Sequence, residues 1–180
     1  YNEDVLAEVK AENAKARGEK YKSEKVIRDI GLMNDWYWAQ SAMRWHSSGE
    51  QVALMLKALD NKDRWIVRLN PKTGEITSLD RQRDEAWIAG PGIGWSMGGA
   101  TFGWMNENTC YFQSEETGYS HLYAMNAVTG EKKALTSGKF EVQSVELAKN
   151  KEFFYLTTNE VHPGQKHFYR MSVQGGTREK

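Results

Sequence analysis

The chain has 180 residues, which is enough to bury one good core and would normally form one domain. Its 24 basic and 24 acidic side chains cancel without any long block of one sign, which excludes nucleic-acid binding driven by counterion release. The apolar runs are far shorter than the ~20 residues that span a bilayer, so no membrane segment is expected. The single cysteine, Cys110, excludes an internal disulfide framework and is expected to be a small buried hydrophobe.

The first 25 residues differ in composition from the rest of the chain. Residues 1–25 are rich in Ala, Glu and Lys, and Val5, Leu6 and Val9 fall on one side of a helix. Gly18 is a residue at which such a helix would end. The pattern predicts a short helical or irregular arm, charged and solvated, on a larger body. A partner-binding helix is the alternative, although the apolar stripe is short.

A strand, a turn with glycine and a second short strand occur three times, with the turn glycines at Gly74, Gly130 and Gly176. The intervals between these glycines are 56 and 46 residues. A repeat of roughly 40 to 50 residues built from short strands is typical of a β-propeller blade. Each copy follows a hairpin of two further strands. The sequence therefore predicts an all-β fold, a partial β-propeller of about three four-stranded antiparallel blades, near residues 26–88, 100–142 and 143–180.

The longer interval coincides with a Gly-rich run at residues 89–100, which has no counterpart before the next blade. We interpret this run as a loop inserted between blades. A propeller needs at least about four blades to close, so the chain is expected to be a piece of a larger protein. Unpaired strand edges favour self-association, which leaves a homo-oligomer open.

Ser96 lies in the run Gly94 to Gly98, which fits the G-x-S-x-G pattern of a hydrolase nucleophile. That chemistry needs a strand before the serine and a helix after it, so that the strained turn exposes the hydroxyl. Gly90 and Pro91 are poor strand residues, and the segment after Gly98 alternates like a strand. Ser96 is therefore predicted to be a loop residue, with a free-standing esterase built on it as the minor alternative.

No set of side chains has the spacing of a metal site or of a general acid/base pair, so neither a metal nor a cofactor is predicted. The four histidines are isolated or flank a turn, at His46, His121, His162 and His167. The scattered carboxylates that we considered are Asp35, Glu115, Glu116 and Glu160.

The segment at residues 114–123, SEETGYSHLY, followed by LTSG at 135–138 and FEV at 140–142, resembles the N-terminal β-propeller of dipeptidyl peptidase IV. This propeller occurs in serine peptidases of the prolyl oligopeptidase family, and the likeness is to the bacterial type. The resemblance continues through FFY at 153–155 and HPG at 162–164, and it covers the chain from about Val26 onward. The residues that carry the motif, to which a structural role is given, are Glu115, Gly118, Tyr119, His121, Tyr123 and Glu141.

The resemblance implies that the chain walls and gates the substrate cavity of a peptidase that cleaves short peptides. The catalytic Ser-Asp-His triad would lie in a C-terminal α/β-hydrolase domain, so no catalytic residue is expected in this chain, which would be inactive alone. The alternative is a non-enzymatic propeller that serves as a protein-interaction scaffold. The compartment is left open between periplasmic or secreted and cytoplasmic, in a bacterium.

The resemblance also extends to Asp35-Trp36, after which members of the family carry paired glutamates that hold the substrate's amino group. Here Ala39 and Gln40 follow instead. The choice between dipeptidyl-peptidase and oligopeptidase specificity therefore stays open. Side chains predicted to face the cavity, with aromatic packing under the first blade as the alternative, are Trp36, Tyr37 and Trp38.

Overall fold

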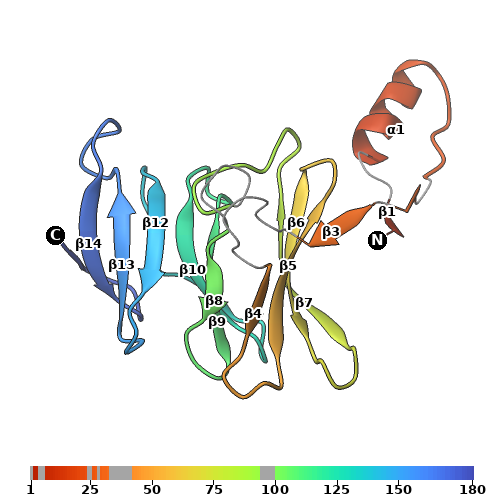
Figure 1. Ribbon diagram of the computed structural model, residues 1–180. Helices are drawn as coiled ribbons and strands as arrows, with labels where there is room; N and C mark the ends of the chain where they lie inside the picture. The colour runs from red at the N-terminus through yellow and green to blue at the C-terminus, as the bar shows by residue number, and fades with distance from the viewer. Residues whose placement is uncertain (1, 4–6, 24–25, 28, 33–41, 94–99) are drawn as a thin grey trace.

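The computed structural model describes residues 2–3, 7–23, 26–27, 29–32, 42–93 and 100–180. It confirms the predicted all-β fold, because three antiparallel sheets stand side by side in chain order as three blades (Figure 1). Blade 1 contains β3 (Ile30–Leu32), β4 (Met43–Trp45), β5 (Val52–Ala58), β6 (Asp63–Leu69) and β7 (Ile76–Arg83). Blade 2 contains β8 (Phe102–Trp104), β9 (Thr109–Ser114), β10 (His121–Asn126) and β11 (Lys132–Ala134). Blade 3 contains β12 (Val142–Leu147), β13 (Phe153–Thr158), β14 (His167–Ser172) and β15 (Arg178–Glu179).

The innermost strand of blade 1 is divided into two pieces. Strands β3 and β4 pair with the same edge of β5, with Ile30 opposite Ala58 and Met43 opposite Leu54. Ile30 and Met43 are 13 residues apart in the sequence, whereas their partners Ala58 and Leu54 are only four residues apart on β5. The predicted cavity-facing residues Trp36, Tyr37 and Trp38 lie outside the described residues.

The turn glycines of the repeat have the backbone conformation that the sequence predicts. The side-chain oxygen of Asn70 accepts hydrogen bonds from the amides two and three residues on, and Asn126 does the same in the next blade. Gly74 and Gly130 follow with φ of 75° and 76°, and Gly176 has φ of 100°. Glycine adopts this left-handed conformation without the steric cost that a Cβ atom adds. The repeated turns are therefore encoded locally.

Strand alternation gives each blade two faces, which we call the leading face, toward the preceding blade, and the trailing face, toward the following blade. The trailing face of blade 1 packs on the leading face of blade 2, where the indole of Trp104 donates to the backbone oxygen of Arg44 at 2.8 Å. The trailing face of blade 2 packs on blade 3, where Tyr111 meets Phe154 edge to face at 5.0 Å. Cys110 is buried in the first of these interfaces, as predicted, and burial raises the pKa of its thiol to about 12.

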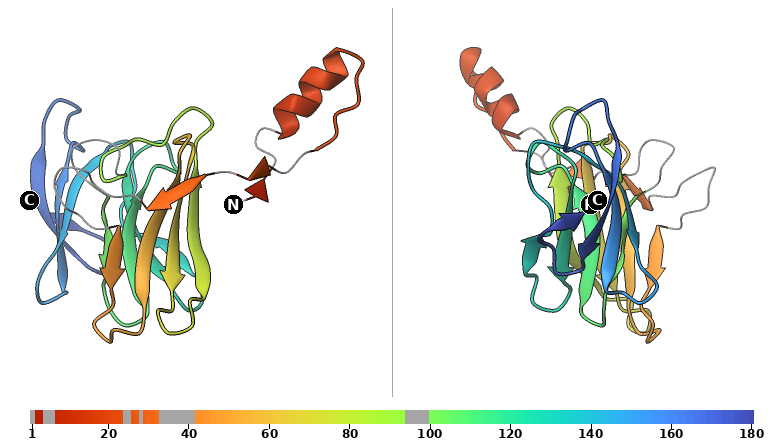
Figure 2. Two further views of the ribbon diagram at one scale, coloured as in Figure 1. Left: turned by 45° about the vertical axis from the view of Figure 1, so that its right-hand side comes forward. Right: turned by 90° about the vertical axis from the view of Figure 1, so that its left-hand side faces the viewer.

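The N-terminal arm contains β1 (Asn2–Glu3), α1 (Ala7–Ala16) and β2 (Val26–Ile27), with β1 and β2 paired. The helix ends before Gly18, whose φ of 73° confirms its predicted role as a stop. In both orientations of Figure 2, α1 lies apart from the blades. No helix in the described part of the chain is long and apolar enough to cross a membrane.

Candidate functional site at the crossover end of the blades

One end of the blades gathers all the connections between neighbouring blades. In a sheet of four antiparallel strands, the second and fourth strands end on the same side. The turns after the second strands and the crossings to the next blade therefore share one end, which we call the crossover end. The described residues that form it are 59–62, 84–93, 100–101, 115–120, 135–141 and 159–166.

Five of the six motif residues lie at or beside this end. Glu115, Gly118 and Tyr119 belong to the turn between β9 and β10, His121 is the first residue of β10, and Glu141 directly precedes β12. Tyr123 lies deeper in β10, where its ring stacks on Phe112 at 6.0 Å.

The Glu115 carboxylate is half-buried against the start of the Gly-rich run. The backbone amide of Ala89 donates a hydrogen bond to it, and a side chain at Gly90 would overlap it. Burial raises the pKa of Glu115, and the negative charge of Glu141 acts in the same direction. The Ala89 amide and the positive charge of Arg64 oppose this rise. The surroundings of Glu115 therefore disfavour its charged form.

A cavity of about 260 Å³ separates Glu115 from the end of β7. Its walls carry carboxylates from blade 2 and guanidinium groups from blade 1, which suits hydrogen bonding to a polar or charged group. The residues that line it are Arg81, Gln82, Arg83, Asp84, Ile88, Ser114, Glu115 and Glu116.

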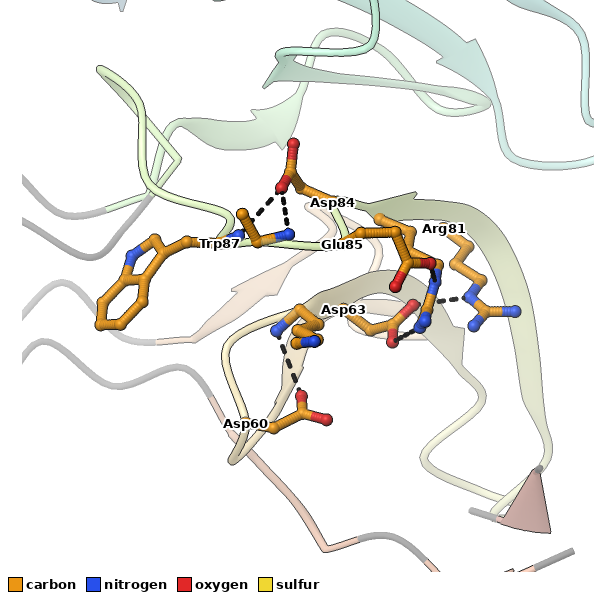
Figure 3. A network of polar contacts seen from close by, with 9 residues as sticks. Asp60, Asp63, Arg81, Asp84, Glu85 and Trp87 are labelled. Atoms are coloured by element: carbon orange, nitrogen blue, oxygen red, sulfur yellow. Dashed lines mark hydrogen bonds and ion pairs between the residues drawn. The ribbon is translucent and has the colours of Figure 1, made fainter. Parts of the chain in front are cut away.

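The guanidinium wall is held by a buried carboxylate, as Figure 3 shows. The two oxygens of Asp63 accept from Arg81 at 2.9 Å and from Arg83 at 2.5 Å, and Arg83 also donates to Glu85 at 2.9 Å. The Asp63 side chain is fully inaccessible, whereas Glu85 is exposed. A buried carboxylate is stable only when it is paired, so Asp63 fixes the direction of both guanidinium groups.

Asp84 shapes the segment that leaves β7. One of its carboxylate oxygens accepts from the amides of Trp87 at 2.9 Å and Ala86 at 2.7 Å, and these two bonds lower the pKa of Asp84 (Figure 3). The Trp87 ring is exposed beyond this turn. The amide of Ile88 then bonds to the backbone oxygen of Asn61, which ties this segment to the β5–β6 turn.

Arg64 fastens blade 1 to blade 2 beneath the cavity. Its side chain is fully buried in β6 and donates to the Gln82 side chain at 2.8 Å and to the backbone oxygens of Ile93 and Gln113. Burial lowers the pKa of Arg64 to about 10, with Asp80 opposing the change, so the guanidinium stays charged at neutral pH.

The first part of the predicted inserted loop is packed into the site. Ile93 is completely buried, and the backbone oxygen of Pro91 accepts from the Ser120 hydroxyl at 2.7 Å. Gly92 has φ of 68°, and a side chain there would overlap the buried amide of Gln113. Ser96, in the second part of the run, lies outside the described residues.

His121 holds the crossing from blade 2 to blade 3. Its Nε2 lies 2.9 Å from the backbone oxygen of Gly138, which can only accept, so Nε2 carries the proton. Its Nδ1 lies 3.0 Å from the Thr136 hydroxyl, which donates to it. Glu141, at the end of the same crossing, accepts from the backbone amide of Ser120 at 2.6 Å. The motif residues His121 and Glu141 therefore act here as supports for the backbone.

The other histidines and carboxylates that we considered in the sequence are not brought together in the described part of the chain. His46 contacts the Ser48 hydroxyl at 2.8 Å in the turn before β5, at the opposite end of the blades. Glu160 pairs with Arg178 within blade 3, and His162 and His167 flank the turn that precedes β14. Within the described ranges, no three His, Cys, Asp or Glu side chains are placed to hold a metal ion.

Sequence reasoning missed the buried charges between blades. Lys132, in the outer strand of blade 2, donates to Asp80 of blade 1 at 2.8 Å and to Glu116, with its ammonium 4.9 Å from the centre of the Tyr123 ring. Lys132 and Asp80 are 52 positions apart in the sequence. No local pattern links the two residues; only an alignment of outer strands between blades would have suggested the pair.

The family model for the dipeptidyl peptidase IV N-terminal region matches residues 9–180. Among solved structures, the chain is similar to a protein classed as a dipeptidyl aminopeptidase IV from Bacteroides ovatus, with a TM-score of 0.64 and 16% identity over 88% of this chain. It is also similar to dipeptidyl peptidase 4 from Porphyromonas gingivalis, with a TM-score of 0.61 and 15% identity over 87% of this chain. The chain spans 24% and 21% of the lengths of those two proteins. No curated protein matches it.

Proposed function

The chain belongs to the family of the dipeptidyl peptidase IV N-terminal region, and we propose that it walls and gates the substrate cavity of a serine peptidase that hydrolyses short peptides. The observation that carries this proposal is the family match over nearly the whole chain, together with three blades in propeller order. The catalytic triad would be supplied by a C-terminal α/β-hydrolase domain of the parent protein, and the blades would exclude folded proteins from it.

The contacts of the histidines support a structural role for this chain rather than a catalytic one. The two histidines that touch a hydroxyl are His121, at Thr136, and His46, at Ser48. Both contacts hold turns or crossings, and neither lines the cavity at the crossover end. A nucleophile needs a base within hydrogen-bond reach and a site beside it for the reacting atom. The side chains at the crossover cavity instead suit binding and positioning.

A fluorophosphonate probe tests where the nucleophile lies. We expect the full-length gene product to be labelled and the 180-residue chain to remain unlabelled, because the reactive serine would belong to the hydrolase domain. Full-length protein with Ser96→Ala is the control and should be labelled as strongly as the parent. Absence of label on the full-length protein would instead support a non-enzymatic scaffold, and labelling of the 180-residue chain that Ser96→Ala abolishes would support an esterase.

Specificity is tested on the labelled full-length enzyme with matched peptides whose amino terminus is free or acetylated. A dipeptidyl peptidase must bind the free amine, whose pairing with a carboxylate is a charge-assisted contact. Strong preference for the free amine would identify a dipeptidyl peptidase. Equal cleavage of both peptides would identify an oligopeptidase, consistent with Ala39 and Gln40 after the Asp35-Trp36 segment.

A further inference from the structure

A second polar cavity lies in blade 1, at the end of the blade opposite the crossover end. Its volume is about 320 Å³, and its walls come from the turn between β4 and β5 and from the turn between β6 and β7 with the strand ends beside it. Both turns lie at the lower end of blade 1 in Figure 1. Small-molecule sites occupy roughly 300–1,000 Å³. The cavity is therefore large enough for a ligand of the size of an amino acid or a dipeptide.

The polar side chains of this cavity lie on the trailing face of blade 1, which blade 2 follows within the same chain. Arg68 and Thr77 are cross-strand partners, and Arg68 lies on the same face as Ile66, which packs against blade 2. The positive charge of Arg68 also acts on the Cys110 thiol of blade 2, where it opposes the rise of the pKa. The cavity therefore does not belong to an end face of the three-blade stack.

Arg68 brings a positive charge to the cavity without a carboxylate partner. Its guanidinium is half-buried and approaches the Thr77 hydroxyl at 3.5 Å, and no carboxylate of the described residues forms an ion pair with it. Lys72, the other cation of the cavity, is already paired with Glu50 at 2.9 Å. Because a guanidinium forms two parallel hydrogen bonds with a carboxylate, Arg68 suits the carboxylate of a ligand.

Gln51 places a buried acceptor in the same cavity. Its side-chain oxygen is inaccessible and accepts no hydrogen bond from the described part of the chain. A buried polar atom without a partner destabilises the folded state, so such an atom calls for a donor. The exposed carboxylate of Glu75, at the rim, also has no ion-pair partner among the described residues. Gln51 and Glu75 together suit the ammonium group of a ligand.

Blade 2 has a cavity of about 260 Å³ at the equivalent position, but its polar groups are used inside the chain. Ala124 stands two residues before the turn asparagine of blade 2, as Arg68 does in blade 1. The cross-strand partner of Ala124 is Lys133, which donates to the backbone oxygen of Gln174 in blade 3 at 3.0 Å. The repeat therefore accounts for a hollow at this position, whereas the unpaired guanidinium is specific to blade 1.

We propose that the cavity of blade 1, which we call the turn-end site and whose binding groups are Gln51, Arg68 and Glu75, binds a small zwitterion such as a free amino acid or a dipeptide. The carboxylate of the ligand pairs with Arg68, and its ammonium group donates to the side-chain oxygen of Gln51 with Glu75 beside it. Each unpaired group of the site then has a partner of the complementary kind. The proposal does not depend on the peptidase assignment.

Calorimetric titration of the full-length gene product with alanine and with dialanine tests for binding and separates the two sources of the zwitterion. We expect saturable binding of at least one of them. The matched ligands that lack one charge are the N-acetylated form and the carboxamide, and each should bind at least about 10-fold more weakly. Failure of both zwitterions to bind, or equal binding of the capped forms, would overturn the proposal.

Two arginine variants show whether the ligand occupies the turn-end site or another part of the protein. Arg68→Met keeps the length of the side chain and should raise the dissociation constant of the zwitterion at least about 10-fold. The carboxamide, which has no carboxylate, should bind the variant and the parent alike. Arg170→Met is the matched control, because Arg170 pairs with Glu179 in blade 3, and it should leave the dissociation constant unchanged. Unchanged affinity in Arg68→Met would mean that the ligand binds elsewhere, whether or not the protein is a peptidase.

Gln51→Met gives a readout that separates ligand binding from a structural role. The substitution replaces a buried oxygen that has no donor by a group of similar size that needs none. Without ligand, the midpoint of thermal unfolding should therefore not fall, whereas the dissociation constant of the zwitterion should rise at least about 10-fold. A lower midpoint would show that Gln51 supports the fold, and an unchanged dissociation constant would show that its oxygen does not hold the ammonium group. Either result would count against the turn-end site.

Discussion

Gly92 and Gly118 have the same kind of backbone conformation in different surroundings. Their φ values are 68° and 86°, which an L-residue adopts only with strain. A Cβ atom at Gly118 would meet nothing within 4 Å, whereas one at Gly92 would overlap the Gln113 side chain. The Gln113 amide donates to the backbone oxygens of Pro91 and Val142 and to the Ser120 hydroxyl, so it joins three segments of the crossover end.

We therefore expect Gly92→Ala and Gly118→Ala to separate the cost of backbone strain from the cost of overlap with the Gln113 side chain. Gly118→Ala adds only backbone strain and should lower the free energy of unfolding by about 1 kcal/mol. Gly92→Ala adds the displacement of a buried, hydrogen-bonded amide and should lower it by about 3 kcal/mol. Urea denaturation followed by tryptophan fluorescence measures both. Equal losses would mean that the Gln113 contacts contribute nothing to stability.

At the scale of strands and turns, the sequence predicts those features that depend on residues close together in the chain. The turns at Asn70 and Asn126 repeat the same hydrogen bonds because Asn, Thr and Gly recur at the same spacing. Within a strand, alternation decides which side chains share a face, and the register that pairs Phe112 with Tyr123 then brings their rings together. The all-β fold and the three blades follow from such local patterns.

Contacts between blades could not be predicted in this way. Alternation places Arg64 on the trailing face with Ile66, at a position that would ordinarily be apolar. Its acceptors, the backbone oxygens of Ile93 and Gln113, lie 29 and 49 positions away in the sequence. Nothing in β6 itself indicates that a guanidinium there would be buried and bonded. For the same reason, the sequence predicts a loop at residues 89–100 but gives no sign that the backbone oxygens of Pro91 and Ile93 in it accept buried hydrogen bonds.

Arg64→Met should show how much this network stabilises the pairing of the first two blades. The substitution keeps the length of the side chain but removes the guanidinium that donates to the buried oxygen of Ile93 and leaves the oxygen of Gln113 with only the Gln82 side-chain amide, at 3.3 Å. We expect the free energy of unfolding to fall by about 3 kcal/mol, measured by urea denaturation.

Arg68→Met is the matched control, because Arg68 lies four residues further along the same strand and on the same face. Its guanidinium is only half-buried, and its distance to the Thr77 hydroxyl is 3.5 Å. We expect a loss below about 1 kcal/mol. Similar losses for the two variants would show that the Arg64 network contributes no more than an ordinary strand position.

At the scale of the whole molecule, each blade is stabilised by its neighbours in the stack. The two interblade clusters contain residues of adjacent blades only, as expected for a repeat architecture in which each unit contacts the next. The N-terminal arm stands outside this arrangement, because α1 lies apart from the blades and Val9 on it is exposed. Strand β3, in contrast, pairs directly with β5.

Two truncations should therefore differ in their effect on thermal unfolding. Removal of residues 1–23 deletes α1 without removing a strand of any blade, so the midpoint should change by no more than about 2 °C. Removal of residues 1–32 also deletes β3, which exposes the edge of β5 at Ala58 and Leu56. This loss of paired backbone and apolar contact should lower the midpoint by more than about 5 °C. Circular dichroism at a strand-sensitive wavelength measures both midpoints. A drop of the same size for the shorter truncation would mean that the arm packs on the blades in solution.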